Sequence, residues 1–171
     1  MSFLRGLLDR LLLVGAVVAG GLVPGFIAQY RQRLGGRLDQ ARLDLEPWQH
    51  IADQLYQGNI EQLIQFHLHS GDPTFRSEGA VIGALVTTVR QLQGAVDALH
   101  SGLLHQVGYL ALHADPGLVR ATFSDWVPAF ALSAEGLTFA VLFALAVWLL
   151  FHGMWWLLGG RRRLGRSRHY A

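Results

Sequence analysis

The chain of 171 residues has no cysteine and no lysine. Without cysteine it forms no disulfides and holds no thiol nucleophile, thiolate zinc site or iron–sulfur cluster. Its 14 basic residues are therefore all arginines. Between residues 30 and 133 there are seven arginines and ten acids, a net charge of −3. This balance argues against a nucleic-acid-binding domain in that region, so we expect no nucleic-acid partner.

Sequence motifs that carry catalysis are also missing. There is no Gly-rich phosphate loop, no GxSxG elbow, no HExxH pair and no EF-hand loop. The acids are scattered, and pairs such as Asp39 with Asp44 or Asp53 with Glu61 are typical of solvated helix faces. We therefore predict a protein that is not an enzyme, with no catalytic or cofactor-binding residue and no cofactor.

The remaining candidate metal ligands are histidines, namely His67, His69, His100, His105 and His113. A helical metal pair needs a spacing of three or four residues, whereas 67/69 and 100/105 point to different faces. We predict solvated or helix-packing histidines and no metal site. His152 lies within the second apolar segment, where a position at the lipid headgroups is favoured over a proton relay or a haem ligand.

Long apolar runs occur near both ends of the chain. Leu11 to Ile27 contains no charge, and the only ionisable residue of Leu137 to Leu158 is His152. Because about 20 apolar residues cross a bilayer as a helix, we predict transmembrane helices at 11–29 and 133–159. Residues 1–10 and the arginine-rich tail 160–171 then lie in the cytoplasm. Candidate contacts with lipid headgroups are Trp155, Trp156, Arg161, Arg162, Arg163, Arg166 and Arg168.

The first apolar segment has two interpretations. A signal peptide cleaved after Ala19 is one, but the apolar run continues to Ile27, which favours an uncleaved span. This segment also contains small residues four positions apart, which let another helix approach closely. With two glycines further on, the candidate helix-packing residues are Gly15, Ala16, Ala19, Gly20, Gly21, Gly25, Gly35 and Gly36. The alternative is that glycine is simply common in membrane helices.

The region between the spans, 30–132, predicts a bundle of helices. Apolar residues recur every three or four positions from Phe26 onward, which continues the first helix out of the membrane until Pro47. Asn59 with Gln62, and the Asp–Pro pairs at 72–73 and 115–116, predict helix starts. A stripe from Val81 to Leu110 predicts one long helix, with a bend or break favoured near Ser101 and Gly102. The expected helices are about 30–45, 47–57, 60–69, 73–113 and 116–124.

Two groups of arginines disagree about orientation. The tail places the C-terminus in the cytoplasm, and two spans then place the N-terminus there too. Against this, Arg31, Arg33, Arg37 and Arg42 lie on the outer flank of the first span. We prefer both termini inside, because a connection of about 100 residues crosses largely regardless of charge. The four arginines then contact either lipid phosphates or acids of neighbouring helices.

Three blocks carry a family resemblance: PGFIAQYRQRLGGRLDQA, DPTFRSEG and DPGLVRATFSDWVPAFALSAEGL. In this order, over nearly the whole chain, they resemble a family of bacterial two-span inner-membrane proteins known as a domain of unknown function. The resemblance implies an inner-membrane location and a helical extra-membranous region. It transfers no catalytic residue, and the matching motif positions are Pro24, Gly25, Tyr30, Arg33, Gly35, Asp72, Pro73, Arg76, Asp115, Pro116 and Arg120.

The expected fold is an all-α membrane protein, in which two transmembrane helices bracket a helical extra-membranous bundle that includes one long helix. The expected function is non-enzymatic: a multi-pass scaffold or accessory subunit of the bacterial inner membrane. Its partners would be the lipid bilayer and another membrane protein or a second copy of itself, as a homo-oligomer. The alternative is a periplasmic ligand- or lipid-sensing module that works through a partner. An enzyme with a histidine-bound metal is a third, less favoured class.

Overall fold

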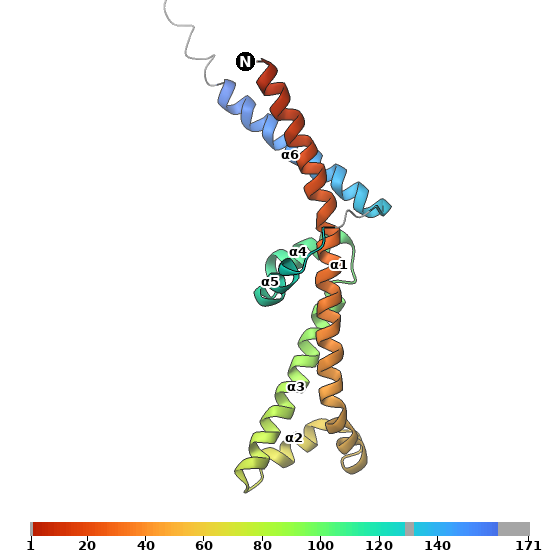
Figure 1. Ribbon diagram of the computed structural model, residues 1–171. Coiled ribbons are helices and arrows are strands. Elements are labelled where there is room, and N and C mark those ends of the chain that lie inside the picture. Colours follow the sequence, from red (N-terminus) through yellow and green to blue (C-terminus); the bar gives the residue numbers. More distant parts are fainter. Residues whose placement is uncertain (1, 129–131, 161–171) are drawn as a thin grey trace, which may run out of the picture. The chain divides into compact units, whose positions relative to one another are not determined.

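The computed structural model describes residues 2–128 and 132–160, and the regular elements in these ranges are all helices. They are α1 (Ser2–Leu55), α2 (Ile60–Leu68), α3 (Pro73–Ala98), α4 (Leu103–His113), α5 (Pro116–Ser124) and α6 (Ala134–Gly160), as Figure 1 shows. The chain divides into two units. The terminal unit comprises Met1–Ile27 and Val127–Ala171, and the central unit is Ala28–Trp126. The expectation of an all-helical protein is confirmed.

Helix α1 is longer than the sequence predicts. It has 54 residues and continues without interruption through Pro47, where we expected one helix to end and another to begin. A proline inside a helix costs about 3 kcal/mol, because it removes one backbone hydrogen bond. The residues around Pro47 offset this cost by burial, since Ala52 is fully buried and Leu45 and Trp48 pack on the core of the central unit.

The expected single helix over 73–113 is also wrong, because the chain forms two helices there. Helix α3 ends at Ala98 and α4 begins at Leu103, so the break lies at the serine and glycine where a break was favoured. The Gln106 side chain stabilises the break by donating hydrogen bonds to the carbonyls of Leu99, at 3.0 Å, and Ser101, at 2.7 Å. Leu99 is the C-cap of α3, where a helix end leaves carbonyls without a partner in the helix, and Ser101 lies in the connection to α4.

In the terminal unit, α1 and α6 are long and apolar enough to cross a membrane. Helix α6 crosses α1 in Figure 1, and small residues lie at the contact. A Cβ added at Gly20 would lie 3.1 Å from the Cα of Ala140, and Ala140 and Ala144 are buried. The helices therefore approach as closely as their backbones allow.

Three helices build one core of the central unit. Ile64 of α2 and Ile82 and Val86 of α3 are buried together, and Leu45, Trp48 and Ile60 pack against them. Helices α2 and α3 come so close that a Cβ at Gly79 would lie 2.9 Å from the Cβ of His67 and 3.0 Å from the backbone nitrogen of Leu68. Only glycine fits at this position.

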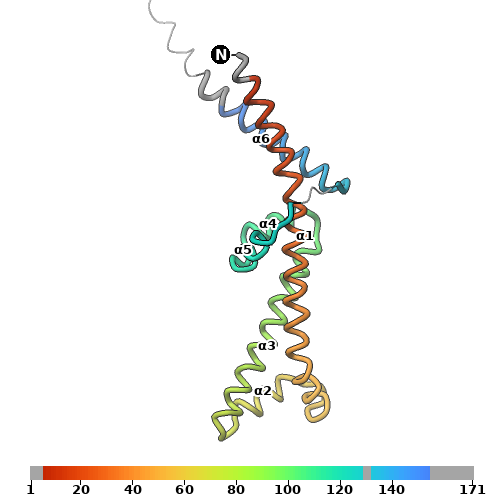
Figure 2. Tube along the Cα trace, in the orientation of Figure 1, coloured from red at the N-terminus to blue at the C-terminus, as the bar shows by residue number. Residues whose placement is uncertain are grey.

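Short turns connect these three helices, as the trace in Figure 2 shows. Helix α1 stops because Gln57 and Gly58 take positive φ values of 55° and 83°, and the Gly58 N–H donates back to the carbonyl of Ala52. Helix α3 starts at the Asp–Pro pair predicted from sequence, where the Asp72 carboxylate accepts from the Thr74 N–H at 2.7 Å. The chain thus reverses direction between α2 and α3, and the Thr74 N–H at the start of α3 has a hydrogen-bond acceptor.

A second row of buried side chains belongs to the part of α1 nearest residue 28. Tyr30, Leu34, Leu38 and Ala41 are each at most 7% exposed and repeat at three- and four-residue steps. From the C-cap of α3 to the end of α5, the buried side chains are Leu99, Leu103, Leu118 and Thr122. The steps along α1 are the helical stripe that the sequence predicts. Contacts of Tyr30 with Asp115 and of Arg33 with Asp125 place α5 beside α1, as Figure 1 shows.

Candidate functional site

The best-defined polar site of the central unit joins α1 to the start of α5. The Asp115 backbone N–H donates to the hydroxyl oxygen of Tyr30 at 3.1 Å, and Tyr30 is only 2% exposed. The Asp115 carboxylate caps α5 by accepting from the Leu118 N–H at 2.5 Å. The same carboxylate lies 3.9 Å from the Arg37 guanidinium. One aspartate thus starts α5 and ties it to α1.

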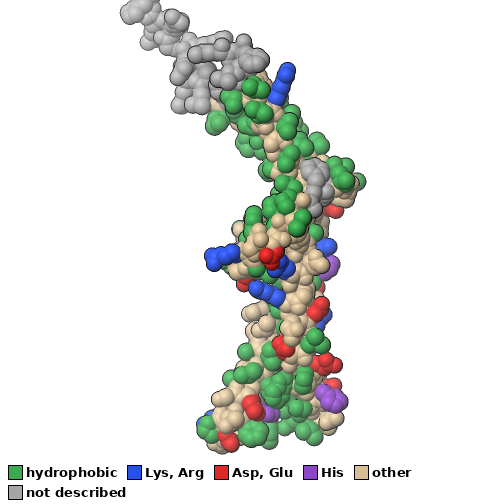
Figure 3. Space-filling view, viewed as in Figure 1, with side chains coloured by type: hydrophobic (Ala, Val, Ile, Leu, Met, Phe, Trp, Pro, Cys, Tyr) green, Lys and Arg blue, Asp and Glu red, His purple; other side chains and the backbone are tan. Residues whose placement is uncertain are grey.

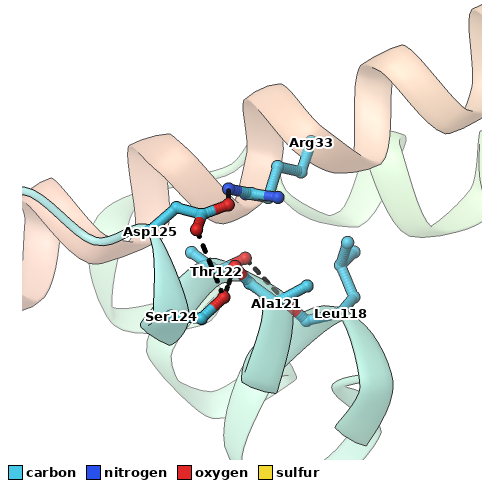
Figure 4. A network of polar contacts seen from close by, with 6 residues as sticks. All are labelled: Arg33, Leu118, Ala121, Thr122, Ser124 and Asp125. Atoms are coloured by element: carbon cyan, nitrogen blue, oxygen red, sulfur yellow. Dashed lines mark hydrogen bonds and ion pairs between the residues drawn. The ribbon is translucent and has the colours of Figure 1, made fainter.

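A second contact holds the other end of α5. The Arg33 guanidinium donates to the Asp125 carboxylate at 2.6 Å, as Figure 4 shows. Between the two ends, the Thr122 hydroxyl is fully buried and donates to the Leu118 carbonyl at 2.7 Å. Because Tyr30, Arg33 and Arg37 follow at steps of three and four, a single face of α1 supplies all three contacts.

We call these contacts of Tyr30, Arg33 and Arg37 with Asp115 and Asp125 the anchor site. Its electrostatics are typical of a structural contact between helices. Burial raises the pKa of the Tyr30 phenol, which lies outside the predicted span, so the hydroxyl keeps its proton at neutral pH. Each acid faces an arginine, and the side chains of Arg33 and Asp125 are 37% and 67% exposed. Exposed pairs of this kind contribute at most about 1 kcal/mol. The arrangement positions helices and holds no nucleophile paired with a base.

The arginines of the outer flank thus acquire acidic neighbours. Arg33 and Arg37 face Asp125 and Asp115, and Arg42 lies 3.8 Å from Asp39 and also donates to Gln93 of α3. Of the two expected roles, contact with acids on neighbouring helices therefore holds for Arg33 and Arg37. Arg31 forms no ion pair within the described residues.

His67 is the buried histidine of the central unit. Its Nδ1 lies 2.9 Å from the Leu63 carbonyl, and its Nε2 lies 3.7 Å from the Glu78 carboxylate. Its ring has three aromatic neighbours, with centroids 5.6–6.1 Å away: Trp48, Phe66 and Phe75. This is the environment of a packed histidine. Within the described residues, no three side chains of the metal-binding types gather at one point.

The other candidate histidines bond mainly within their own helices. The Nδ1 atoms of His69 and His100 lie 2.8 Å from the carbonyls four residues earlier. The His113 ring stacks on Tyr109 with centroids 5.2 Å apart, and His105 is exposed on α4. These histidines are thus separated over three helices.

Sequence reasoning missed one polar pair in the terminal unit. The Asp9 carboxylate lies 3.7 Å from the Nδ1 of His152, whose ring also packs on Trp148 with centroids 4.2 Å apart. One Asp9 oxygen is buried without a hydrogen bond. Asp9 lies just before the uncharged run of the first predicted span, and His152 lies near the end of the second. Because two consecutive spans run antiparallel, their order in the sequence could have predicted that these two residues lie at the same level.

The candidate helix-packing residues fall into three groups. Ala16, Gly20 and Gly21 are buried, while Gly15 and Ala19 are exposed on the other side of the helix. Gly25 and Gly35 are half-buried, and Gly36 is exposed. A Cβ at Gly15, Gly35 or Gly36 would meet nothing within 4 Å. Packing against a partner at these open positions stays a prediction.

The candidate headgroup contacts at the C-terminal end are not placed. The side chains of Trp155 and Trp156, and the arginines Arg161, Arg162, Arg163, Arg166 and Arg168, lie outside the described residues.

One hollow of about 1020 Å³ lies along residues 39–53 of α1. Its lining comes from this one helix and consists of Asp39, Arg42, Leu43, Leu45, Glu46, Pro47, Gln49, His50 and Asp53. Ligand pockets are usually enclosed and mostly apolar. The hollow therefore has the character of an open helix surface.

Comparison with known proteins places this chain in a family. A family model described as "Protein of unknown function (DUF2937)" matches residues 4–164, so the chain belongs to this family. The resemblance seen in the sequence is thereby confirmed as a domain of unknown function that covers most of the chain. No curated protein and no solved structure matches.

Proposed function

We propose that the chain is an integral protein of a bacterial inner membrane that crosses it twice. The observation that carries this proposal is the exposure of apolar side chains on the two long helices. In α1, Leu11, Val14 and Val18 are 60%, 61% and 47% exposed, and in α6 Val141 and Leu150 are 61% and 73% exposed. Only 22% and 11% of the two most apolar windows are buried. A core helix of a soluble protein would be covered by protein, so lipid is the fitting environment.

Both termini lie in the cytoplasm in this proposal, and the central unit lies in the periplasm. On the outer flank of the first span, Arg33 faces Asp125 and Arg37 faces Asp115. Because acids compensate the charge of these arginines, the pairs support a periplasmic position of this flank. Reporter fusions at Ser70 and after Ala171 test the orientation, with a periplasmic signal expected at Ser70 and a cytoplasmic one at Ala171. The opposite pattern overturns it. The mass of the mature protein tests whether the chain is cleaved after Ala19.

The biochemical role that we propose is a scaffold or accessory subunit that acts through helix packing. Supporting it is a set of exposed apolar side chains around α2, the tip patch: Leu55, Phe66, Leu68 and Phe75, which are 71%, 60%, 37% and 44% exposed. Figure 3 shows hydrophobic side chains at this end of the central unit. With a rise of about 1.5 Å per residue, the helix carries Leu55 roughly 37 Å beyond Tyr30. This exposed apolar surface, far along α1 from the predicted span, supports contact with a partner protein.

Photo-crosslinking in native membranes tests this role. A crosslinking amino acid at Phe66 should capture one defined partner, either another membrane protein or a second copy of the chain. The same residue at Thr88, which is exposed on α3 outside the patch, is the matched control. The captured partner should also co-purify with the natural chain and be lost from a Phe66→Asp, Phe75→Asp variant. A strictly monomeric protein that gives no crosslink at Phe66 or Leu55 contradicts the proposal.

The alternative, a ligand-sensing module, needs an apolar pocket between bundle helices. The hollow along α1 is lined by residues of one helix and does not lie between bundle helices, so it gives this alternative no support.

A further inference from the structure

We propose that α4 and α5 form an interfacial segment whose outer face rests on the lipid surface of the bilayer that the chain crosses. This inference rests on the proposed function, because it takes α1 and α6 to be membrane spans. It assigns a lipid-binding surface to residues 103–124, a stretch for which the sequence predicts only helices.

The first step concerns where the chain enters and leaves the central unit. The unit begins at Ala28, directly after the apolar run of α1, and ends at Trp126, with seven residues between it and the first residue of α6, Ala134. Contacts within the unit bring these two ends together, because Tyr30 accepts from Asp115 and Arg33 pairs with Asp125. Both connections to the spans therefore leave from the same end of the unit, and α5 lies at that end.

The second step concerns the outer face of α4, which is apolar and uncovered. Leu104 and Leu112 are 76% and 80% exposed, the largest exposed fractions among the apolar side chains of the central unit. They lie eight residues apart, so they share one face of the helix with Gly108 and Ala111, which are also exposed. The opposite face holds the buried Leu103. Helix α4 thus exposes apolar side chains, together with His105, on the side opposite the buried Leu103.

The third step is the charge of this segment. From Leu99 to Ser124 the only acid is Asp115, which faces α1, and the only arginine is Arg120. Arg120 and Arg31 are exposed and form no ion pair within the described residues. Exposed arginines of this kind suit a bilayer surface, where phosphates lie just outside the acyl chains. An apolar helix face typically enters this boundary by about 5–10 Å.

The tip patch is the internal contrast. It exposes comparable apolar side chains, but it lies at the other end of the central unit, roughly 37 Å along α1 from Tyr30. We therefore assign lipid to α4 and α5, because this end of the unit connects to both predicted spans. We assign a protein partner to the tip patch at the other end.

Fluorescence quenching tests the proposal on the full chain. Since the chain has no cysteine, a single dye can be attached to each of the variants Leu104→Cys, Leu112→Cys, Phe66→Cys and Val18→Cys. The proteins are reconstituted into vesicles of phosphatidylethanolamine and phosphatidylglycerol, some of which carry a quencher on the lipid. All four positions are exposed, so the substitutions preserve folding.

We expect lipid-borne quencher to dim the dyes at residues 104 and 112 and to leave the dye at 66 unchanged. The dye at 18 reports on the span itself. If residues 104 and 112 respond only to an aqueous quencher while 18 responds to lipid, the interfacial segment is refuted and the membrane span stands. If 18 also responds only to the aqueous quencher, the proposed function fails as well. Shielding of 104 and 112 from both quenchers means that protein covers the face, which also overturns the inference.

Discussion

The two halves of α1 are held by different kinds of contact. In the terminal unit, its partner is α6, and the contact consists of small residues such as Gly20 and Ala140 whose backbones nearly touch. In the central unit, its partners are α2 to α5, and large side chains such as Tyr30, Leu34 and Trp48 make the contact, together with polar links to Asp115 and Asp125.

This difference reflects the solvent proposed for each half. In lipid, apolar side chains gain little by leaving their surroundings, so helices associate through close backbone packing. In water, burial of apolar area is the main driving force, at roughly 25 cal/mol per Å². One continuous helix thus changes its packing chemistry near residue 28, where the apolar run ends.

The largest expected effect comes from the one place where the central unit also uses a close backbone approach. Gly79→Leu forces a side chain against the Cβ of His67 and the backbone of Leu68, and we expect a loss of about 3 kcal/mol or more. Hydrogen exchange of the α2 amides measures the resulting opening. Gly94→Leu on the same helix meets nothing within 4 Å, and it should leave that exchange unchanged. Equal effects of the two variants contradict the close contact.

The next effect tests the terminal unit. Gly20→Leu should separate α1 from α6, because its Cβ would already lie 3.1 Å from Ala140 and from Phe143. We expect a cost of about 1–3 kcal/mol, seen as a lower unfolding temperature in detergent by circular dichroism. Gly15→Leu is the matched control on the open side of the helix. If the control is as damaging as Gly20→Leu, then the open side also has a partner.

Tyr30→Phe tests the polar link to α5. Removing the hydroxyl leaves the partly buried Asp115 N–H without its acceptor, so we expect a loss of about 1–2 kcal/mol in the protection of α5 amides from exchange. Tyr56→Phe is the control. The natural protein should also lose stability as pH rises above 10.0, because burial raises the pKa of the folded Tyr30 phenol above that ordinary value. This alkaline loss should be smaller in the Phe variant.

Sequence patterns predicted the helical class and the starts of α2, α3 and α5, because each depends on local signals. Asn59, Asp72 and Asp115 cap the first turns with their own side chains, and no distant partner is needed. The end of α1 was misplaced for the opposite reason. Pro47 is a local signal to stop, but Leu45 and Trp48 pack on a core formed by α2 and α3, which lie further along the chain, and this packing outweighs the signal.

The anchor site was predictable only in part. Tyr30, Arg33 and Asp115 stood out as motif positions, and the arginines were expected to contact either acids or lipid. Which acid each arginine faces depends on the fold of α5 back against α1, between residues up to 92 apart in the chain. Glycines show the same limit, because the sequence does not separate Gly20 at a contact from Gly35 and Gly36 in open space.

The smallest expected effect distinguishes an anchoring arginine from its neighbour. Arg33→Gln removes an exposed ion pair with Asp125, so we expect a loss of about 0.5 kcal/mol, measured as faster exchange of the α5 amides. Salt weakens such pairs, and the difference between variant and natural protein should shrink as ionic strength rises. Arg31→Gln is the matched control, since Arg31 forms no ion pair within the described residues. In lipid vesicles, however, Arg31→Gln should weaken the contact of α4 with a phosphatidylglycerol-rich surface, while Arg33→Gln should not. A reversal of these two responses would show that Arg33 serves the lipid and Arg31 the fold.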